Sequence, residues 1–148
     1  MTNKTAADRE APLTDDILLA ERVAFLLERA STRQLWMMFL DADDVQCPML
    51  MPCAGLPADP AQPAGTGGTG PVTAAQLLGS RVAELLDGTA LAQVVFAWER
   101  PGGSRPDDRE RAWARELADA CTDAGGRVRA QFLVHDRGVR PLTPDDYR

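Results

Sequence analysis

The sequence predicts an α/β fold, and more closely an α+β domain with a mixed sheet. Two short apolar runs, 35–40 and 94–98, contain the β-branched and aromatic residues typical of buried central strands. Three segments that begin near Thr14, Thr73 and Arg109 repeat their apolar residues at helical spacing. The full order of elements, α-β-β-α-β-α-β-β, predicts one three-layer domain with helices on the faces of about five strands.

Length and composition limit the class of protein. The 148 residues suffice for one domain with a buried core, and a hydrophobic fraction of 45% argues against wholesale disorder. The net charge is −6, from 16 Lys and Arg against 22 Asp and Glu. This balance predicts that neither nucleic acid nor a membrane is the main partner. Because residues 1–16 contain no secretory signal and no apolar run approaches roughly 20 residues, we expect a cytoplasmic protein.

The first predicted element is a helix that follows a disordered arm, residues 1–12. Thr14 is expected to cap this helix, with Asp15 and Asp16 in its first turn, where carboxylates suit the helix dipole. Its apolar residues are Ile17, Leu18, Leu19, Val23, Leu26, Leu27 and Ala30. The helix is expected to end near 30–31. We interpret the apolar stripe as core, with a partner-binding groove as the alternative.

A hairpin is predicted next. Strand 35–40 leads into an acidic turn at 41–44, and 45–53 is expected to return beside it. Pro48 and Pro52 cannot donate hydrogen bonds to a neighbouring strand, so this second strand is predicted at the sheet edge. The three aspartates of the turn suggest calcium, but the glycine and distal glutamate of an EF-hand are absent. Turn formation is the favoured interpretation.

Residues 56–71 are rich in Pro, Gly, Ala and Thr and are predicted to be a flexible surface loop. The glycines of 64–70 suggest a phosphate loop, but no Gly-Lys-Ser/Thr follows and no apolar strand precedes them. Thr73 is expected to cap a second helix, which Asp87-Gly88 closes.

The central unit of the predicted fold is a strand, a loop and a helix. Strand 94–98 leads through the proline- and glycine-rich segment 99–108 into a helix that ends at Gly125-Gly126. Loops at the carboxyl end of a strand are where α/β folds usually bind ligands. This loop is therefore the first place to look for a site.

The chain closes with two predicted strands. Residues 127–134 alternate apolar and polar side chains, which predicts a half-exposed strand. A turn at 135–138 precedes a short last strand, 139–142. The tail, 143–148, is expected to fray, so the single domain is expected to span 13–142.

The cysteines predict no disulfide framework. The chain has three cysteines, which is an odd number, and the expected compartment is reducing. They are Cys47, Cys53 and Cys121. Five residues, two of them prolines, separate Cys47 from Cys53, unlike the Cys-x-x-Cys of structural zinc sites. We interpret the cysteines as small core or edge residues and His135 as a turn residue.

The segment Val94–Gly103 has the sequence Val-Val-Phe-Ala-Trp-Glu-Arg-Pro-Gly-Gly. It is similar to the strand that runs into His-x-His-Pro-x-Gly in the RadC-like branch of the JAB1/MPN (JAMM) metalloprotease family. Phe39–Ala42 resembles that family's opening strand and turn, Gly55 falls where a glycine follows its second strand, and Gly126–Gly138 resembles its closing strand and glycine turn. The resemblance covers roughly residues 31–142 and implies a three-layer JAB1/MPN (cytidine-deaminase-like) fold.

The family's zinc motif is His-x-His, seven residues, Ser, two residues and Asp. Trp98 and Arg100 occupy the two histidine positions. Counting straight on places Asp108 and Arg111 at the other two, and with one deleted residue Asp107 and Glu110 occupy them. An indole nitrogen only donates, and a guanidinium has no lone pair for a metal. The resemblance therefore implies a degenerate member. We assign it no catalytic residue, no metal ligand and no cofactor.

The segment that follows strand 94–98 also suggests an anion site. Arg100, Arg105 and Arg109 lie near a helix start, where a phosphate or a carboxylate can bind. The alternative, which we favour, is ion pairing with acidic neighbours. These neighbours are Glu99, Asp107, Asp108 and Glu110. Trp98 is interpreted as core packing or as a plug over the vacated metal position.

Three functions remain open. The favoured hypothesis is a non-catalytic JAB/MPN-like domain, a pseudoenzyme that acts as an interaction or scaffold module for an unknown protein partner or for a second copy of itself. The second is a binder of anions or small ligands through Arg100, Arg105 and Arg109. The third is a divergent hydrolase with a relocated site. His135 is the one histidine available to a Ser-His or Cys-His dyad, and no nucleophile-elbow motif accompanies it.

Overall fold

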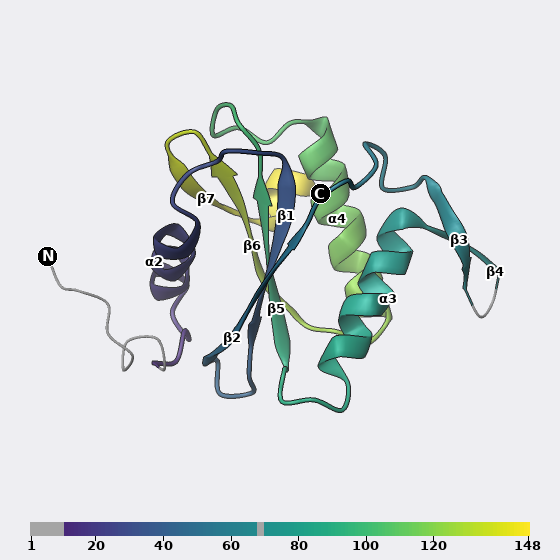
Figure 1. The fold of residues 1–148 in the computed structure, drawn as a ribbon, viewed down its shortest axis with the longest axis horizontal. Helices are drawn as coiled ribbons and strands as arrows, with labels where there is room; N and C mark the ends of the chain where they lie inside the picture. The colour runs from purple at the N-terminus through teal and green to yellow at the C-terminus, as the bar shows by residue number, and fades with distance from the viewer. Residues whose placement is uncertain (1–10, 68–69) are drawn as a thin grey trace, which may run out of the picture.

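A five-stranded mixed sheet, in the order β2-β1-β5-β6-β7, forms the centre of the molecule (Figure 1). The computed structural model describes residues 11–67 and 70–148. The strands of this sheet are β1 (Gln34–Leu40), β2 (Gln46–Cys53), β5 (Gln93–Glu99), β6 (Val128–His135) and β7 (Gly138–Leu142). The helices are α2 (Asp16–Leu27), α3 (Ala74–Leu86), α4 (Asp108–Asp123) and α5 (Pro144–Tyr147). Strands β5 and β6 are parallel and the other neighbouring pairs are antiparallel, so the predicted α/β class with a mixed sheet is confirmed.

Helices cover both faces of the sheet, with α2 on one side and α3 and α4 on the other (Figure 1). Side chains alternate between these faces along each strand. Phe96 of β5 belongs to a buried cluster with Val82 of α3 and Leu117 of α4. Its neighbour Val95 belongs to a second cluster with Val23 of α2. The predicted three-layer arrangement is therefore confirmed. No helix in the described part of the chain is long and apolar enough to cross a membrane.

Strand β5 and helix α4 position the site described below. All seven residues of β5 are buried, because β1 and β6 flank the strand and helices cover both faces. Helix α4 begins with a capping box, in which Asp107 accepts from the backbone of Glu110 and the Glu110 side chain accepts from the backbone of Asp107. Gly79 lets α3 approach α4 closely, since a Cβ there would lie 2.7 Å from the Cβ of Ala120.

Three local predictions are confirmed. Strand β2 pairs antiparallel with β1 and lies at the sheet edge. Asp41 of the acidic turn accepts hydrogen bonds from the backbone N–H groups of Asp43 and Val45, which is the work of a turn residue. Thr73 caps α3 and forms a capping box with Gln76.

The prediction that Thr14 caps the first helix is wrong. The cap of α2 is Asp15, whose carboxylate accepts from the N–H of Ile17 at 2.6 Å. The helix also ends earlier than expected, at Leu27, because Glu28 adopts a positive φ of 53° and leaves helical geometry. Residues 1–10 of the predicted disordered arm lie outside the described residues.

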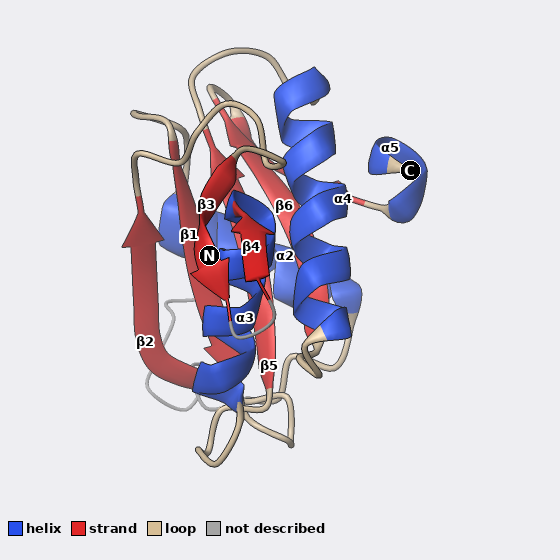
Figure 2. Ribbon diagram, turned by 90° about the vertical axis from the view of Figure 1, so that its right-hand side faces the viewer, coloured by secondary structure: helices blue, strands red, loops and turns tan. Residues whose placement is uncertain are grey.

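The prediction of a flexible surface loop over 56–71 is wrong in part. Strands β3 (Pro63–Gly67) and β4 (Gly70–Thr73) pair antiparallel as a separate two-stranded sheet beside α3 (Figure 2). Gly65 and Gly70 have φ values of 118° and 125°, which other residues rarely adopt. The abundance of glycine therefore allows this small sheet. Residues 68–69, also part of the predicted loop, lie outside the described residues.

Two predictions near the carboxyl terminus are corrected. Strand β6 is buried from Gln131 to Val134, because it lies between β5 and β7 with helices on both faces, so a half-exposed strand is wrong for that stretch. The predicted fraying tail contains the short helix α5. Asp146 stabilises its start by accepting from the backbone N–H and the hydroxyl of Thr143.

Candidate functional site

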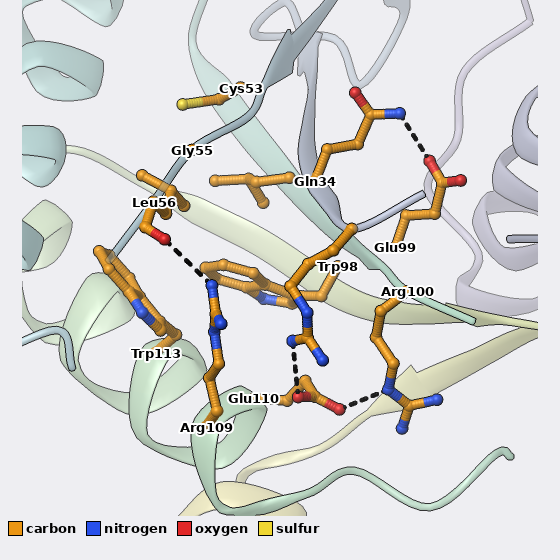
Figure 3. A pocket seen from close by; sticks show the side chains of 12 residues that line it. Gln34, Cys53, Gly55, Leu56, Trp98, Glu99, Arg100, Arg109, Glu110 and Trp113 are labelled. Atoms are coloured by element: carbon orange, nitrogen blue, oxygen red, sulfur yellow. Dashed lines mark hydrogen bonds and ion pairs between the residues drawn. The ribbon is translucent and has the colours of Figure 1, made fainter. Parts of the chain in front are cut away.

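A cavity of about 250 Å³ lies where β5 ends and α4 begins (Figure 3). Its walls come from segments far apart in the sequence: the start of β1, the end of β2 with the residues after it (53–56), the end of β5 and the first turns of α4. The apolar lining residues are Leu35, Cys53, Leu56, Trp98 and Trp113. The charged lining residues are Arg33, Glu99, Arg100, Arg109 and Glu110. The predicted location of a site, at the carboxyl end of the central strand, therefore coincides with a cavity.

Two indole rings form much of the apolar wall. The ring centroids of Trp98 and Trp113 lie 5.9 Å apart, and the ring planes are tilted by 44°. The Trp98 Nε1 donates to Gln131 Oε1 at 2.8 Å, and the Trp113 Nε1 donates to the carbonyl of Pro57 at 2.8 Å. Both indole donors thus already have acceptors in the protein. What the rings offer the cavity is carbon surface.

Glu99, the last residue of β5, is a buried carboxylate that is saturated with hydrogen bonds. Ser31 donates to it through both its backbone N–H and its hydroxyl, and the backbone of Thr32 donates to the same oxygen. Gln34 Nε2 and Trp36 Nε1 donate to the other oxygen at 2.9 and 2.7 Å. Burial opposes ionisation, but these hydrogen bonds outweigh it and lower the pKa of Glu99 to about 2. The carboxylate therefore ties the start of β1 to the end of β5.

Arg100 is buried and organises the loop that follows β5. Its Nε donates to Glu110 Oε1 at 2.7 Å. Its two terminal nitrogens donate to the carbonyls of Gly103 and Arg105, at 2.6 and 2.7 Å. Gly102 has a φ of 123°, and a Cβ there would lie 3.2 Å from Arg100 Nη1, so a glycine fits this wrap best. All three kinds of guanidinium nitrogen are therefore engaged within the protein.

Glu110 lies at the edge of the cavity in a crowded electrostatic environment. Its Oε1 accepts from Arg100 and from the backbone N–H of Asp107, and its Oε2 lies 3.4 Å from Arg33 Nη1. Burial raises the pKa of Glu110, and the nearby Asp107 carboxylate adds to the increase, while Arg100 opposes it. The pKa of Asp107 is lowered: burial acts against ionisation, but hydrogen bonds to Glu110 outweigh it.

Arg109 is the arginine of the cavity wall that forms no ion pair with a described residue. It rises from the first turn of α4 beside the indoles, and its Nη2 donates to the carbonyl of Leu56 at 3.0 Å (Figure 3). No other residue of 11–67 or 70–148 accepts a hydrogen bond from its guanidinium. A guanidinium has five N–H donors, so most of those on Arg109 are available to a ligand. With three arginines and two glutamates, the lining has a net charge of +1 in a protein of net charge −6.

The structure does not bring the three arginines of the predicted anion site together. Arg100 and Arg109 line the cavity, but Arg105 is exposed on the loop and contributes only its carbonyl, to Arg100. Of the favoured ion pairs, the one between Arg100 and Glu110 is present. Trp98 is both core and cavity wall, with 6% of its surface exposed.

Other predicted ligands and catalytic groups do not converge. No three or more His, Cys, Asp and Glu side chains within the described ranges are grouped so that they can hold a metal ion. The Nδ1 of His135 accepts from the backbone of Arg137, within its own turn. Burial raises the pKa of the Cys53 thiol and raises that of Cys121 to about 11, so neither is an activated nucleophile.

Sequence reasoning missed half of the cavity wall. Arg33 and Leu35 reach the cavity because β1 pairs antiparallel with β5, with Leu35 opposite Trp98. Leu56 and Trp113 reach it because the backbone of 56–57 accepts hydrogen bonds from α4. A single sequence contains no signal for these pairings.

No protein-family model, no curated protein and no solved structure matches this chain. The similarity to the RadC-like branch of the JAB1/MPN family therefore stays a prediction.

Proposed function

We propose that this chain is a non-catalytic ligand-binding domain, and that its site is the cavity between β5, α4 and residues 53–56. The observation that supports the proposal is the combination of an apolar cavity with a poorly satisfied cation. Ligand sites are typically concave, mostly apolar and equipped with a few well-placed polar groups. The wall formed by Trp98, Trp113 and Leu56, with Arg109 beside it, fits that description.

The non-catalytic part of the proposal rests on the state of the polar groups. Glu110 is paired with Arg100, Glu99 is saturated, and burial keeps the Cys53 thiol protonated. We also propose that the fold is of the JAB1/MPN type and that the chain is a degenerate member of that family. The observed order of the larger elements agrees with the order on which the resemblance rests.

Protection of Cys53 tests the proposed site directly, because this thiol lines the cavity. Cys47 lies on the same strand, outside the cavity, and burial raises the pKa of both thiols, so it is a matched control. We expect a ligand to slow alkylation of Cys53 but not of Cys47 and to raise the melting temperature. A panel of small acids, amides and amines at millimolar concentration that changes neither quantity would contradict the proposal.

Metal analysis tests the proposal against a divergent metallohydrolase. We expect the purified protein to contain far less than one equivalent of zinc, manganese or iron. Addition of EDTA is expected to leave the melting temperature unchanged, because residues 11–67 and 70–148 contain no group of His, Cys, Asp and Glu side chains that could hold a metal. A stoichiometric metal whose removal lowers the melting temperature would favour the hydrolase.

A second candidate function is self-association or partner binding through α2. Ile17, Leu18 and Phe25 are 69%, 47% and 47% exposed, which is unusual for large apolar side chains on one helix. This exposure supports the interaction-module hypothesis. Light scattering over a range of concentrations tests self-association: a dimer that Phe25→Ser abolishes supports it, and a monomer throughout counts against it.

A further inference from the structure

The class of ligand can be narrowed, on the assumption that the cavity is the binding site. The volume of about 250 Å³ sets the size. A buried apolar cavity of about 150 Å³ accommodates benzene, so this one accommodates roughly ten non-hydrogen atoms. That corresponds to one ring with a short substituent. A nucleotide or a peptide of several residues is too large to be enclosed.

The apolar walls of the cavity favour a ligand whose main part is apolar. Leu35, Leu56 and the two indoles contribute carbon surface, and the indole nitrogens already donate to Gln131 and to Pro57. A polar ligand body would therefore lose its hydrogen bonds to water and find no replacement along these walls. A flat aromatic or branched aliphatic body loses nothing and buries apolar surface.

The charged side chains of the lining favour a ligand with an anionic head group. The two lining carboxylates are already compensated: Glu99 accepts five hydrogen bonds, and Glu110 contacts both Arg100 and Arg33. The donors that remain belong to Arg109, which uses one N–H for Leu56, and to the half-exposed Arg33. A cationic head group would meet these arginines, whereas a carboxylate can accept two parallel hydrogen bonds from one guanidinium.

We infer that the cavity binds a small monocarboxylic acid with a compact apolar or aryl body, and that Arg109 is the residue that binds its carboxylate. The indoles of Trp98 and Trp113 enclose the body. Arg100 has a different role, because its guanidinium is engaged by Glu110 and by two loop carbonyls. One negative charge on the ligand matches the net charge of +1 on the lining.

Three probes of nearly equal shape test the inference: phenylacetate, its neutral amide phenylacetamide, and the cation 2-phenylethylamine. Calorimetric titration is expected to give phenylacetate at least tenfold tighter binding than phenylacetamide, and no measurable binding of the amine. Arg109→Gln is expected to remove the difference between acid and amide. Arg109 and Leu56 are both half-buried, so water can replace the lost hydrogen bond to the Leu56 carbonyl, and folding should be preserved.

The control is Arg105→Gln, which removes the same charge from the neighbouring loop but not from the cavity. This variant should retain the preference for the acid. Equal binding of acid and amide, or a preference that survives Arg109→Gln, would overturn the carboxylate inference and leave the cavity as the site. If none of the three probes binds or protects Cys53, the proposed binding function fails along with it.

Discussion

Two buried glutamates flank the cavity and differ in almost every electrostatic respect. Glu99 accepts five hydrogen bonds from groups without charge, and its pKa falls to about 2. Glu110 shares its surroundings with two arginines and with Asp107, and its pKa is raised. A carboxylate surrounded by fixed neutral donors is a structural anchor. One that is surrounded by charged groups can respond to a charge that enters the cavity.

The same contrast separates the arginines. Arg100 donates to three acceptors that belong to the fold, and it is 6% exposed. Arg109 precedes Glu110 in the chain, but its own hydrogen bond goes to the carbonyl of Leu56. Side chains whose hydrogen-bonding groups all have partners within the protein stabilise the structure. Side chains with free donors remain available to bind a ligand. Substitutions of both kinds of side chain test this division.

The largest effect is expected for Glu99→Ala. The substitution leaves five donors without their acceptor, and each buried donor without a partner is costly. We expect the free energy of unfolding to fall by about 4 kcal/mol. Urea denaturation measures this loss, with Asp43→Ala in the exposed turn as the control. A loss below about 1 kcal/mol would show that Glu99 is not an anchor.

A somewhat smaller loss is expected for Arg100→Met. It leaves Glu110 buried without its closest cation and frees the carbonyls of Gly103 and Arg105. Removal of one partner of a buried ion pair typically costs about 3 kcal/mol. The double variant Arg100→Met, Glu110→Met should be less destabilised than the sum of the single changes. Additivity of the two changes would contradict a direct coupling between these side chains.

These residues also show how far the sequence predicts the structure. The central strand and the helix after it follow from apolar periodicity and from capping residues, so β5 and α4 are found almost where expected. The Arg100–Glu110 pair is local in sequence and was among the expected ion pairs. The partners of Glu99 come from residues 31–36, and only the pairing of β1 with β5 brings them there.

Polar residues inside the core are a second reason why the sequence does not predict the whole structure. Gln131 interrupts an apolar strand and therefore predicts exposure, yet it is 2% exposed. Its amide accepts from the Trp98 indole and donates to the carbonyl of Ala114, so burial leaves neither group unsatisfied. A pattern of apolar and polar letters does not contain such pairings. For the same reason it does not reveal that Trp98 and Trp113 share a cavity wall.

The pH dependence of stability should separate Glu99 from Glu110. A carboxyl whose pKa is lower in the folded state than in the unfolded state stabilises the fold above its ordinary pKa, and this contribution disappears as the pH falls. For Glu99 this contribution to stability is lost between pH 4.5, the ordinary pKa, and about 2, the pKa in the folded state. Between pH 6 and pH 3 we expect the wild type to lose about 2 kcal/mol more than Glu99→Gln does. If the wild type and Glu99→Gln lost the same free energy of unfolding over this range, the pKa of Glu99 would not be lowered by folding. Glu99 and Glu110 would then not differ in the way inferred.

The smallest effect is expected for Glu110→Gln, and it concerns binding. The raised pKa of Glu110 means that its ionised form is disfavoured in the fold, so loss of that charge should change stability at pH 7 by no more than about 1 kcal/mol. The lining would change from +1 to +2, because Arg33, Arg100 and Arg109 remain. Phenylacetate should then bind roughly threefold more tightly at low ionic strength, and added salt should reduce the gain. Weaker binding of phenylacetate by this variant would mean that Glu110 orients Arg109 or the ligand. The side chains that hold the fold together and those that bind the ligand would then not be separate sets.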